Sequence, residues 1–473
     1  MAVINFIVSI LSEPALLVGL LALVGLALQG KAIEDIVMGT VKTVVGFLVL
    51  SAGASYLQSG SLLAFGELFN YAFHMQGVVP NNEAVVSMAL TQFGSDSALI
   101  MCVGMVLNIV LARFSRMHYI FLTGHHTLYM ACMLAVVLSI GGLEGPMLII
   151  GGGCVLAMIM VLSPAYCQPT FRKVTGAGDA VGFGHFGGIG YAFAAQVGKL
   201  FKGGKSTEDI NFPKRLIFLR DTTVAISITM MIFFLIVTGV AVANGILEAD
   251  PTQFSNLNVL LNVGTETTTN WIVWSLESGM AFAGGVYIVL SGVRMIVGEI
   301  VPAFKGISEK LVPGAIPAID CPVCFPYAPN AVIIGFLVSF VGGIVGLLIL
   351  MAIDANLAPV ALILPGAVPH FFCGASAGVF GNAEGGLKGC IAGAFAHGLL
   401  ITLLPAICMP VFTALGFTSA TFSDADFSWL GIVFGNLAQA VPGMPLFVIC
   451  LLCFVVPIVY NFVAPKPKAA AAE

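Results

Sequence analysis

An acidic residue, Asp320, lies in a stretch of chain that cannot form one continuous helix. The stretch, 313–330, reads PGAIPAIDCPVCFPYAPN and holds five prolines and no other charge. Each proline removes an amide donor and clashes with the preceding helical turn. A long apolar segment follows, so this is broken backbone at membrane depth, which is tolerated where it is buried in protein or lines a cavity. An acid there predicts a substrate-binding residue, with a simple helix N-cap as the alternative.

Histidines supply a second group of candidates. His125 and His126 open a predicted helix in Thr-Gly-His-His, and Tyr129 lies one turn beyond His125 on the same face. Imidazoles both donate and accept hydrogen bonds, which suits a polar substrate. His185 lies within Gly-Phe-Gly-His-Phe-Gly-Gly, a composition typical of backbone that approaches a ligand closely. An interfacial histidine pair and a flexible cytoplasmic loop remain the ordinary alternatives, and His370 is interpreted as a packing histidine.

Composition places these residues in a membrane protein. The 473 residues are 59 % hydrophobic and 9 % charged, whereas soluble domains carry about 25 % charged residues. The net charge of -5 and the lack of a basic tract predict no nucleic-acid partner. The chain has no Walker A motif, which excludes ATP-driven transport by this chain alone. Eleven cysteines, mostly within apolar runs, resemble small hydrophobic residues, and no metal or cofactor is predicted.

The apolar runs predict an all-α polytopic protein with about eleven transmembrane helices, because each run approaches the ~20 residues that a bilayer requires. The expected helices are 14–30, 36–57, 96–112, 119–140, 146–164, 221–244, 271–300, 330–353, 356–380, 388–412 and 429–463. Lysine and arginine fall on alternate connections between these runs. Positive charge marks the cytoplasmic side, so the N-terminus is expected outside and the C-terminus in the cytoplasm.

Three short matches indicate an internal repeat. GTVKTVVG at 39–46 matches SGVRMIVG at 291–298, the segment from 96 matches that from 330, and FLTG at 121–124 matches ILPG at 363–366. An offset of five spans inverts the second copy, and inverted repeats with interrupted segments at the midplane are a transporter architecture.

The repeat divides the expected single membrane domain, 1–473, into parts. These are a first repeat at about 14–165, a cytoplasmic or re-entrant linker at about 166–220, a second repeat at about 221–412 and a last helix at about 429–463. The counterpart of 313–330 is the segment before the third helix, which carries Asn82 and Glu83. Two interrupted segments from opposite faces would then bring Asp320 and this pair together, with external loop residues as the alternative.

Several longer motifs carry a family resemblance. They are GTVKTVVGF (39–47), LTGH (122–125), Gly184-His185, FPKRLIFLRD (212–221), FKGISEKLVPGAIPAIDC (304–321) and YAPNAV (327–332). Through them the chain resembles, over about 14–460, the ascorbate-specific enzyme IIC family of the bacterial phosphoenolpyruvate-dependent phosphotransferase system.

The resemblance implies an eleven-span homodimer of the bacterial inner membrane, in which a core domain moves against a dimerising scaffold. It implies uptake of a sugar and its phosphorylation at the inner face by a separate enzyme IIB, which enzyme IIA supplies. The chain itself would carry no phosphoryl group. The resemblance places the substrate contacts at Asn82, Glu83, His125, His126, Thr127, Leu128, Tyr129, His185, Phe186 and Asp320.

This chain departs from the family pattern at several of these positions. The family has glutamine at the positions of Tyr129 and Phe186, and a Thr-Tyr pair in place of Asn82 and Glu83. Glutamine donates and accepts hydrogen bonds, whereas phenylalanine does neither. Ascorbate is therefore the first candidate substrate, with another sugar, polyol or sugar acid as the alternative. A rival function is ion-coupled secondary transport with Glu83 or Asp320 as the ion site.

Overall fold

The computed structural model describes residues 14–57, 61, 63–74, 77–176, 178–210, 218, 221–257, 270–414, 416–418 and 420–463. The helices are α2 (Pro14–Leu28), α3 (Ile33–Leu57), α4 (Leu63–Phe73), α5 (Asn82–Phe114), α6 (Gly124–Ile140), α7 (Gly145–Thr175), α8 (Gly188–Gly198), α9 (Thr222–Ala243), α10 (Trp271–Leu311), α11 (Pro329–Asn356), α12 (Ala367–Pro369), α13 (Ala375–Thr413), α14 (Ala425–Ala440) and α15 (Met444–Val463). Short strands β1 (Gly77–Pro80), β2 (Tyr119–Phe121), β3 (Gly182–Phe183), β4 (Ile316–Ile319), β5 (Leu362–Ile363) and β6 (Ala420–Thr421) connect them.

The described chain is mostly helical, as predicted for a polytopic membrane protein. Six helical segments within the described residues are long and apolar enough to cross a membrane: Asn82–Phe114, Gly145–Thr175, Ile226–Ala243, Pro329–Asn356, His370–Thr413 and Met444–Val463. The shorter helix α6 is also apolar.

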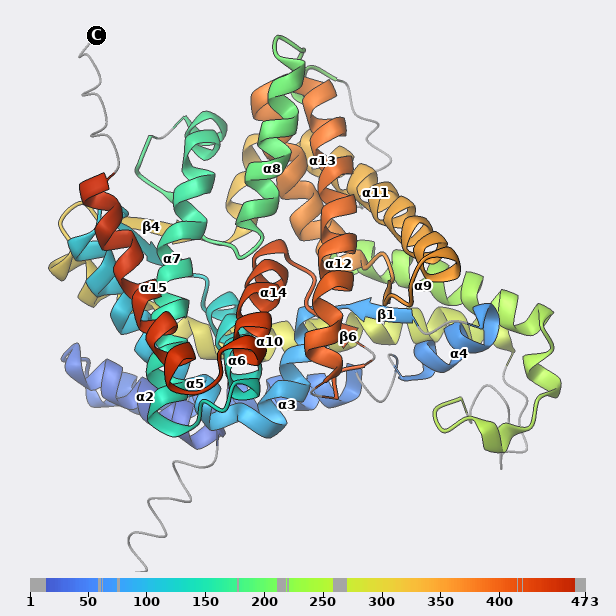
Figure 1. The fold of residues 1–473 in the computed structure, drawn as a ribbon, viewed down its shortest axis with the longest axis horizontal. Helices are drawn as coiled ribbons and strands as arrows, with labels where there is room; N and C mark the ends of the chain where they lie inside the picture. The colour runs from blue at the N-terminus through green and yellow to red at the C-terminus, as the bar shows by residue number, and fades with distance from the viewer. Residues whose placement is uncertain are drawn as a thin grey trace, which may run out of the picture.

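The helices form two groups. Helix α3 packs against α10 and α2. Helix α10 also packs against α9, and α9 packs against α4. Figure 1 shows α2, α3 and α10 crossing the lower half of the view. In the other group, α7 packs against α5 and α15, while α13 packs against α8, α11 and α14. Helix α14 also packs against α6 and joins the two parts of this second group.

Two three-stranded parallel sheets lie within the second group of helices. One has the order β5-β1-β6 and the other β2-β4-β3. Each central strand therefore comes from one half of the sequence and its two neighbours from the other half. Strand pairing satisfies the backbone polar groups of chain that is not helical, which is required at membrane depth.

The stretch 313–330 is non-helical in the way its prolines predict. It forms strand β4 and then the 3₁₀ segment η7 (Cys321–Tyr327), and Asp320 is the N-cap between them. Its counterpart is shorter than expected. Helix α5 begins at Asn82, which Asn81 caps by accepting a hydrogen bond from the Ala84 amide, and not near residue 96.

Two further predicted helices are interrupted in the structure, and the one expected at 119–140 begins only at Gly124, after strand β2. The segment 356–380 is not one helix, because Pro365 and Pro369 interrupt it between β5 and the π-helical turn η8 (His370–Gly374). The range 429–463 holds two helices, α14 and α15. Pro442 lacks an amide donor and Gly443 has a φ of 72°, so the chain turns between them.

Helix α13 contains a break that requires glycine. Gly386 has φ 61° and ψ -152°, and a Cβ there would overlap the carbonyl oxygens of Gly204 and Lys205. We expect Gly386→Ala to destabilise the protein by about 3 kcal/mol, measured as a lower unfolding temperature in detergent. The control is Gly66→Ala in α4, where a Cβ meets no atom within 4 Å. Equal unfolding temperatures for the two variants would contradict this prediction.

Candidate functional site

A cavity of about 300 Å³ lies where the carboxyl ends of both sheets converge. Strands β1, β2, β3, β4 and β6 are each followed within a few residues by a side chain that lines it: Glu83, Thr123, His185, Asp320 and Asp424. Helices α5, α6 and α14 also begin at this place. The described lining residues thus come from seven segments that are far apart in the sequence.

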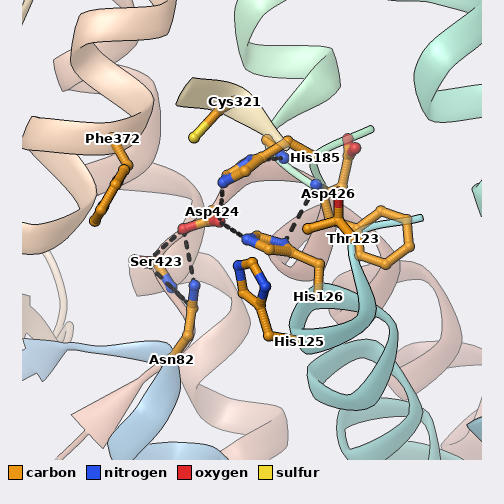
Figure 2. Close-up of polar contacts among 12 residues, drawn as sticks. Asn82, Thr123, His125, His126, His185, Cys321, Phe372, Ser423, Asp424 and Asp426 are labelled. Carbon is orange, nitrogen blue, oxygen red and sulfur yellow. Dashed lines mark hydrogen bonds and ion pairs between the residues drawn. The ribbon is translucent and has the colours of Figure 1, made fainter. Parts of the chain in front are cut away.

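Two buried histidines, His126 and His185, both point Nε2 at the carboxylate of Asp424 (Figure 2). The Nδ1 atom of His185 accepts a hydrogen bond from the Gly187 amide, and that of His126 accepts one from the Phe186 amide. Both Nε2 atoms therefore carry the proton when the rings are neutral. Each Nε2 lies 3.8 Å from Oδ2 of Asp424. A substrate hydroxyl beside this group can accept from Nε2–H and donate to Oδ2.

Asp424 is held in place through its other oxygen. Its Oδ1 accepts hydrogen bonds from the Asn82 side-chain amide at 3.0 Å and from the Ser423 hydroxyl at 2.6 Å. The Ser423 amide in turn donates to Asn82 Oδ1 at 2.9 Å. Because its amide group is used in this way, Asn82 orients Asp424 and joins the start of α5 to the start of α14.

Asp320 forms the opposite part of the cavity wall. Its Oδ1 accepts a hydrogen bond from the Cys321 amide at 2.7 Å, so Asp320 is an N-cap that also lines the cavity, and substrate binding by it stays a prediction. Its Oδ2 lies 3.5 Å from Nε2 of His125, and its Oδ1 lies 3.9 Å from Nε2 of His185. Three imidazoles and two aspartates therefore surround one small space.

The structure brings most of the predicted site residues together. Seven of the predicted positions line the cavity: Asn82, Glu83, His125, His126, Tyr129, His185 and Asp320. The other three pack away from it. Thr127 donates to the carbonyl of Thr123, Leu128 lies in the apolar core, and Phe186 stacks on Phe121. His370 is also outside the lining, with its Nδ1 hydrogen-bonded to Ser339 at 2.8 Å.

Two polar atoms at the cavity are buried without a partner in the described structure. They are Oε2 of Glu83 and the hydroxyl of Tyr129. Buried polar groups are ordinarily hydrogen-bonded, so an unpaired pair at a cavity marks positions where a ligand can bond. Both residues are positions where the chain departs from the family pattern described above.

Asp424, Ser423 and Arg294 are lining residues that the sequence analysis missed. The connection 413–428 carries acids and no lysine or arginine, which is the pattern of an external loop. A signal was present, because Asp424 follows His185 by about the 240 residues that also separate Asp320 from Asn81. Extended past the expected ends of the two repeats at about 165 and 412, this offset pairs His185 with Asp424.

A neighbouring carboxylate, Asp426, serves the architecture and does not line the cavity. It accepts hydrogen bonds from the Ser163 and Tyr166 hydroxyls, each at 2.8 Å, and from the Trp429 indole at 3.1 Å. It also accepts from the amides of Gly188 and Ile189, each at 3.1 Å. Asp426 thus fixes the loop that carries His185 against α7 and α14.

Three overlapping sets of side chains are close enough to hold a metal ion. They are His125, His126 and Asp320; His126, His185 and Asp424; and His185, Asp320 and Cys321. The candidate ligand atoms of each set lie within 4.8 Å of one another. Imidazole and carboxylate are ordinary ligands of zinc and related ions. The absence of a metal therefore stays a prediction.

Tyr191 positions His185 from behind the cavity. Its hydroxyl lies 2.7 Å from Nδ1 of His185, which the Gly187 amide shows to be an acceptor. We expect Tyr191→Phe to weaken substrate binding by about 3- to 10-fold, because it removes one hydrogen bond that orients the ring. Calorimetric titration with the transported sugar measures this loss. Phenylalanine keeps the ring packing, so an unchanged unfolding temperature is also expected, and unchanged affinity would remove Tyr191 from this role.

Comparisons with known proteins place the chain among transport proteins. The family described as the PTS system sugar-specific permease component matches residues 9–426. The ascorbate-specific PTS system EIIC component of Mycoplasma pneumoniae is 27 % identical over 434 residues, which cover 80 % of this chain and 62 % of that protein. The chain therefore spans less than two thirds of the length of this relative.

Proposed function

Because this chain belongs to the family of sugar-specific permease components of the phosphotransferase system, we propose that it carries ascorbate or a related sugar or polyol across the bacterial inner membrane for phosphorylation by a separate enzyme IIB. The observation that carries the proposal is the cavity, which three imidazoles and two aspartates line. It lies at two sheets, in each of which the central strand comes from one half of the sequence and its two neighbours from the other. Such groups donate to and accept from sugar hydroxyls. We assign substrate binding to the seven predicted lining residues and to Asp424.

The proposal includes eleven spans in two inverted repeats, divided as the sequence predicts, with the N-terminus outside. The strand order supports the repeat, since each central strand is flanked by strands of the other half. The two groups of helices support an elevator mechanism. One group, α2, α3, α4, α9 and α10, would serve as a dimerising scaffold, and the group that carries the site would move against it.

The partner would dock on a basic inner surface. We place this surface near the basic residues between 199 and 220, of which residues 211–217, 219 and 220 lie outside the described residues. Lys202, Lys205 and Lys388 are exposed, and the Leu387 amide donates to the carbonyl of Lys205, which places these lysines on one surface. Positive charge favours an acidic or phosphorylated partner. After phosphorylation the sugar no longer fits the cavity with its carboxylates, which makes uptake one-way.

The rival, ion-coupled secondary transport, is favoured by one observation. Oε2 of Glu83 is buried and unpaired, as a proton- or sodium-binding carboxylate would be without its ion.

Reconstitution of the purified chain in liposomes separates the two. We expect radiolabelled sugar to accumulate as its phosphate only when phosphorylated IIB is enclosed, and not with a IIB whose phosphoryl-accepting cysteine is replaced by serine. Accumulation of unmodified sugar under an ion gradient, without IIB, would overturn the proposal in favour of the rival.

A further inference from the structure

We propose that the cavity selects an uncharged polyhydroxylated substrate, a sugar alcohol or neutral sugar, over the ascorbate anion. The inference rests on the proposed function and narrows the substrate class of the same site. It follows from the charges, the helix termini and the unpaired hydrogen-bonding groups that surround the cavity.

The permanent charges at the cavity are mainly negative. Glu83, Asp320 and Asp424 line it, and Arg294 is the one lysine or arginine among the described lining residues. The Arg294 side chain is exposed at the rim. Even if Glu83 is counted as a neutral acid, the two aspartates outnumber this single cation. Ascorbate carries a full negative charge at neutral pH, and a like charge a few ångströms away in a partly desolvated site is unfavourable.

Protonated histidines do not reverse this balance. His125 faces Asp320 at 3.5 Å, while His126 and His185 both face Asp424 at 3.8 Å. A proton on His125, and one on either His126 or His185, is therefore neutralised by a carboxylate that is already present. The ring of imidazoles and aspartates retains polarity without a surplus of positive charge for an anionic substrate.

Helix N-termini would ordinarily attract an anion to such a place. Here the chain supplies the negative charge itself. Glu83 lies in the first turn of α5, and Asp424 is the N-cap of α14. Helix α6 begins at the cavity with His125 and His126 in its first turn. The partial positive charges at the N-termini of α5 and α14 are therefore already balanced by carboxylates of the chain.

The cavity has polar groups without a hydrogen-bond partner, and these groups are suited to bond hydroxyl groups of a substrate. An ionised carboxylate only accepts hydrogen bonds, and a tyrosine hydroxyl donates and accepts. Oε2 of Glu83 and the Tyr129 hydroxyl have no hydrogen-bond partner in the described structure, and Oδ2 of Asp424 faces the two Nε2 atoms. A polyol presents alternating donors and acceptors on each carbon, whereas an anionic oxygen offers only acceptors. A site built to bond a hydroxyl group discriminates against a ligand that places an acceptor-only oxygen at that position, as an aldonate or the ascorbate anion does.

Matched ligand pairs test the inference on the purified full-length protein. Each pair keeps the carbon skeleton and changes one end group: sorbitol against gluconate, and xylitol against xylonate, with L-ascorbate measured alongside and other hexitols and pentitols added to extend the panel. We expect calorimetric titration to show at least tenfold tighter binding of a polyol than of its matched acid and of ascorbate. We also expect Glu83→Gln to reduce this ratio severalfold.

The outcomes separate this inference from the proposed function. Tightest binding of ascorbate or of an aldonate to the wild-type protein overturns the inference, and if the anion is also taken up only with phosphorylated IIB the proposed function stands. Preferred binding of a polyol with ion-driven uptake and no need for IIB supports the inference and overturns the function. Folded protein that binds no member of the panel contradicts both. The wild-type ranking decides the question even if Glu83→Gln does not fold.

Discussion

Asp424→Asn is expected to weaken substrate binding by about 10- to 100-fold, with little effect on folding. Asparagine keeps an oxygen that can accept from Asn82 and Ser423, as Oδ1 of the aspartate does. Its amide nitrogen, however, replaces Oδ2, which faces Nε2 of both His126 and His185. Donors then face donors across the cavity, and the acceptor for a substrate hydroxyl is lost. Calorimetric titration with the transported sugar measures the change in Kd.

A control for the loss of charge alone is available elsewhere in the chain. Asp354 lies outside the cavity lining, where its Oδ1 accepts from the Val360 amide. We expect Asp354→Asn to bind substrate as the wild type does. A Kd for Asp424→Asn within about twofold of the wild type, less than one hydrogen bond is worth, would remove Asp424 from the site.

Asp426→Asn is expected to have a different signature, a loss of stability of about 3 kcal/mol or more. Five donors converge on this buried carboxylate, from Ser163, Tyr166, Trp429 and the amides of Gly188 and Ile189. Asparagine offers a single acceptor oxygen, and its amide group would face other donors. Unfolding in detergent, followed by tryptophan fluorescence, measures the effect.

The pair of variants makes the two roles distinguishable. Asp424→Asn should reduce affinity while the unfolding temperature is retained, and Asp426→Asn should lower the unfolding temperature. Because the Gly188 and Ile189 amides lie close to His185 in the chain, affinity should fall in Asp426→Asn as well. A wild-type unfolding temperature for Asp426→Asn would show that its five hydrogen bonds do not hold this region together.

Residue type predicted much of the candidate site. Histidines and an acid within broken or glycine-rich backbone are costly to keep at membrane depth, which selected His125, His185 and Asp320. The family resemblance implied contacts at Thr127 and Leu128, whereas helical geometry turns both side chains into the core. Asp424 was missed because its segment, read alone, looks like an exposed acidic loop.

The helices predicted from apolar runs are least accurate near prolines. The expected helix 356–380 and the long last helix 429–463 are interrupted, at Pro365 and Pro369 in the first case and at Pro442-Gly443 in the second. Hydropathy measures the length of an apolar run and does not report its backbone conformation. Proline disfavours a continuous helix, so the prolines in these two ranges predict the interruptions better than the apolar pattern does.

The sequence by itself determined that this is a helical membrane protein of a sugar-permease family, with broken backbone around Asp320 and histidines suited to a polar ligand. Composition, hydrophobic run length and proline chemistry are local properties, so they can be read along the chain. Only the tertiary structure decided which residues share the cavity. Pairing of β6 with β1 brings Asp424 to Asn82, and packing of α14 against α6 and α8 brings it to His126 and His185, across more than half of the chain. That proximity depends on long-range strand pairing and helix packing, and no local pattern encodes it.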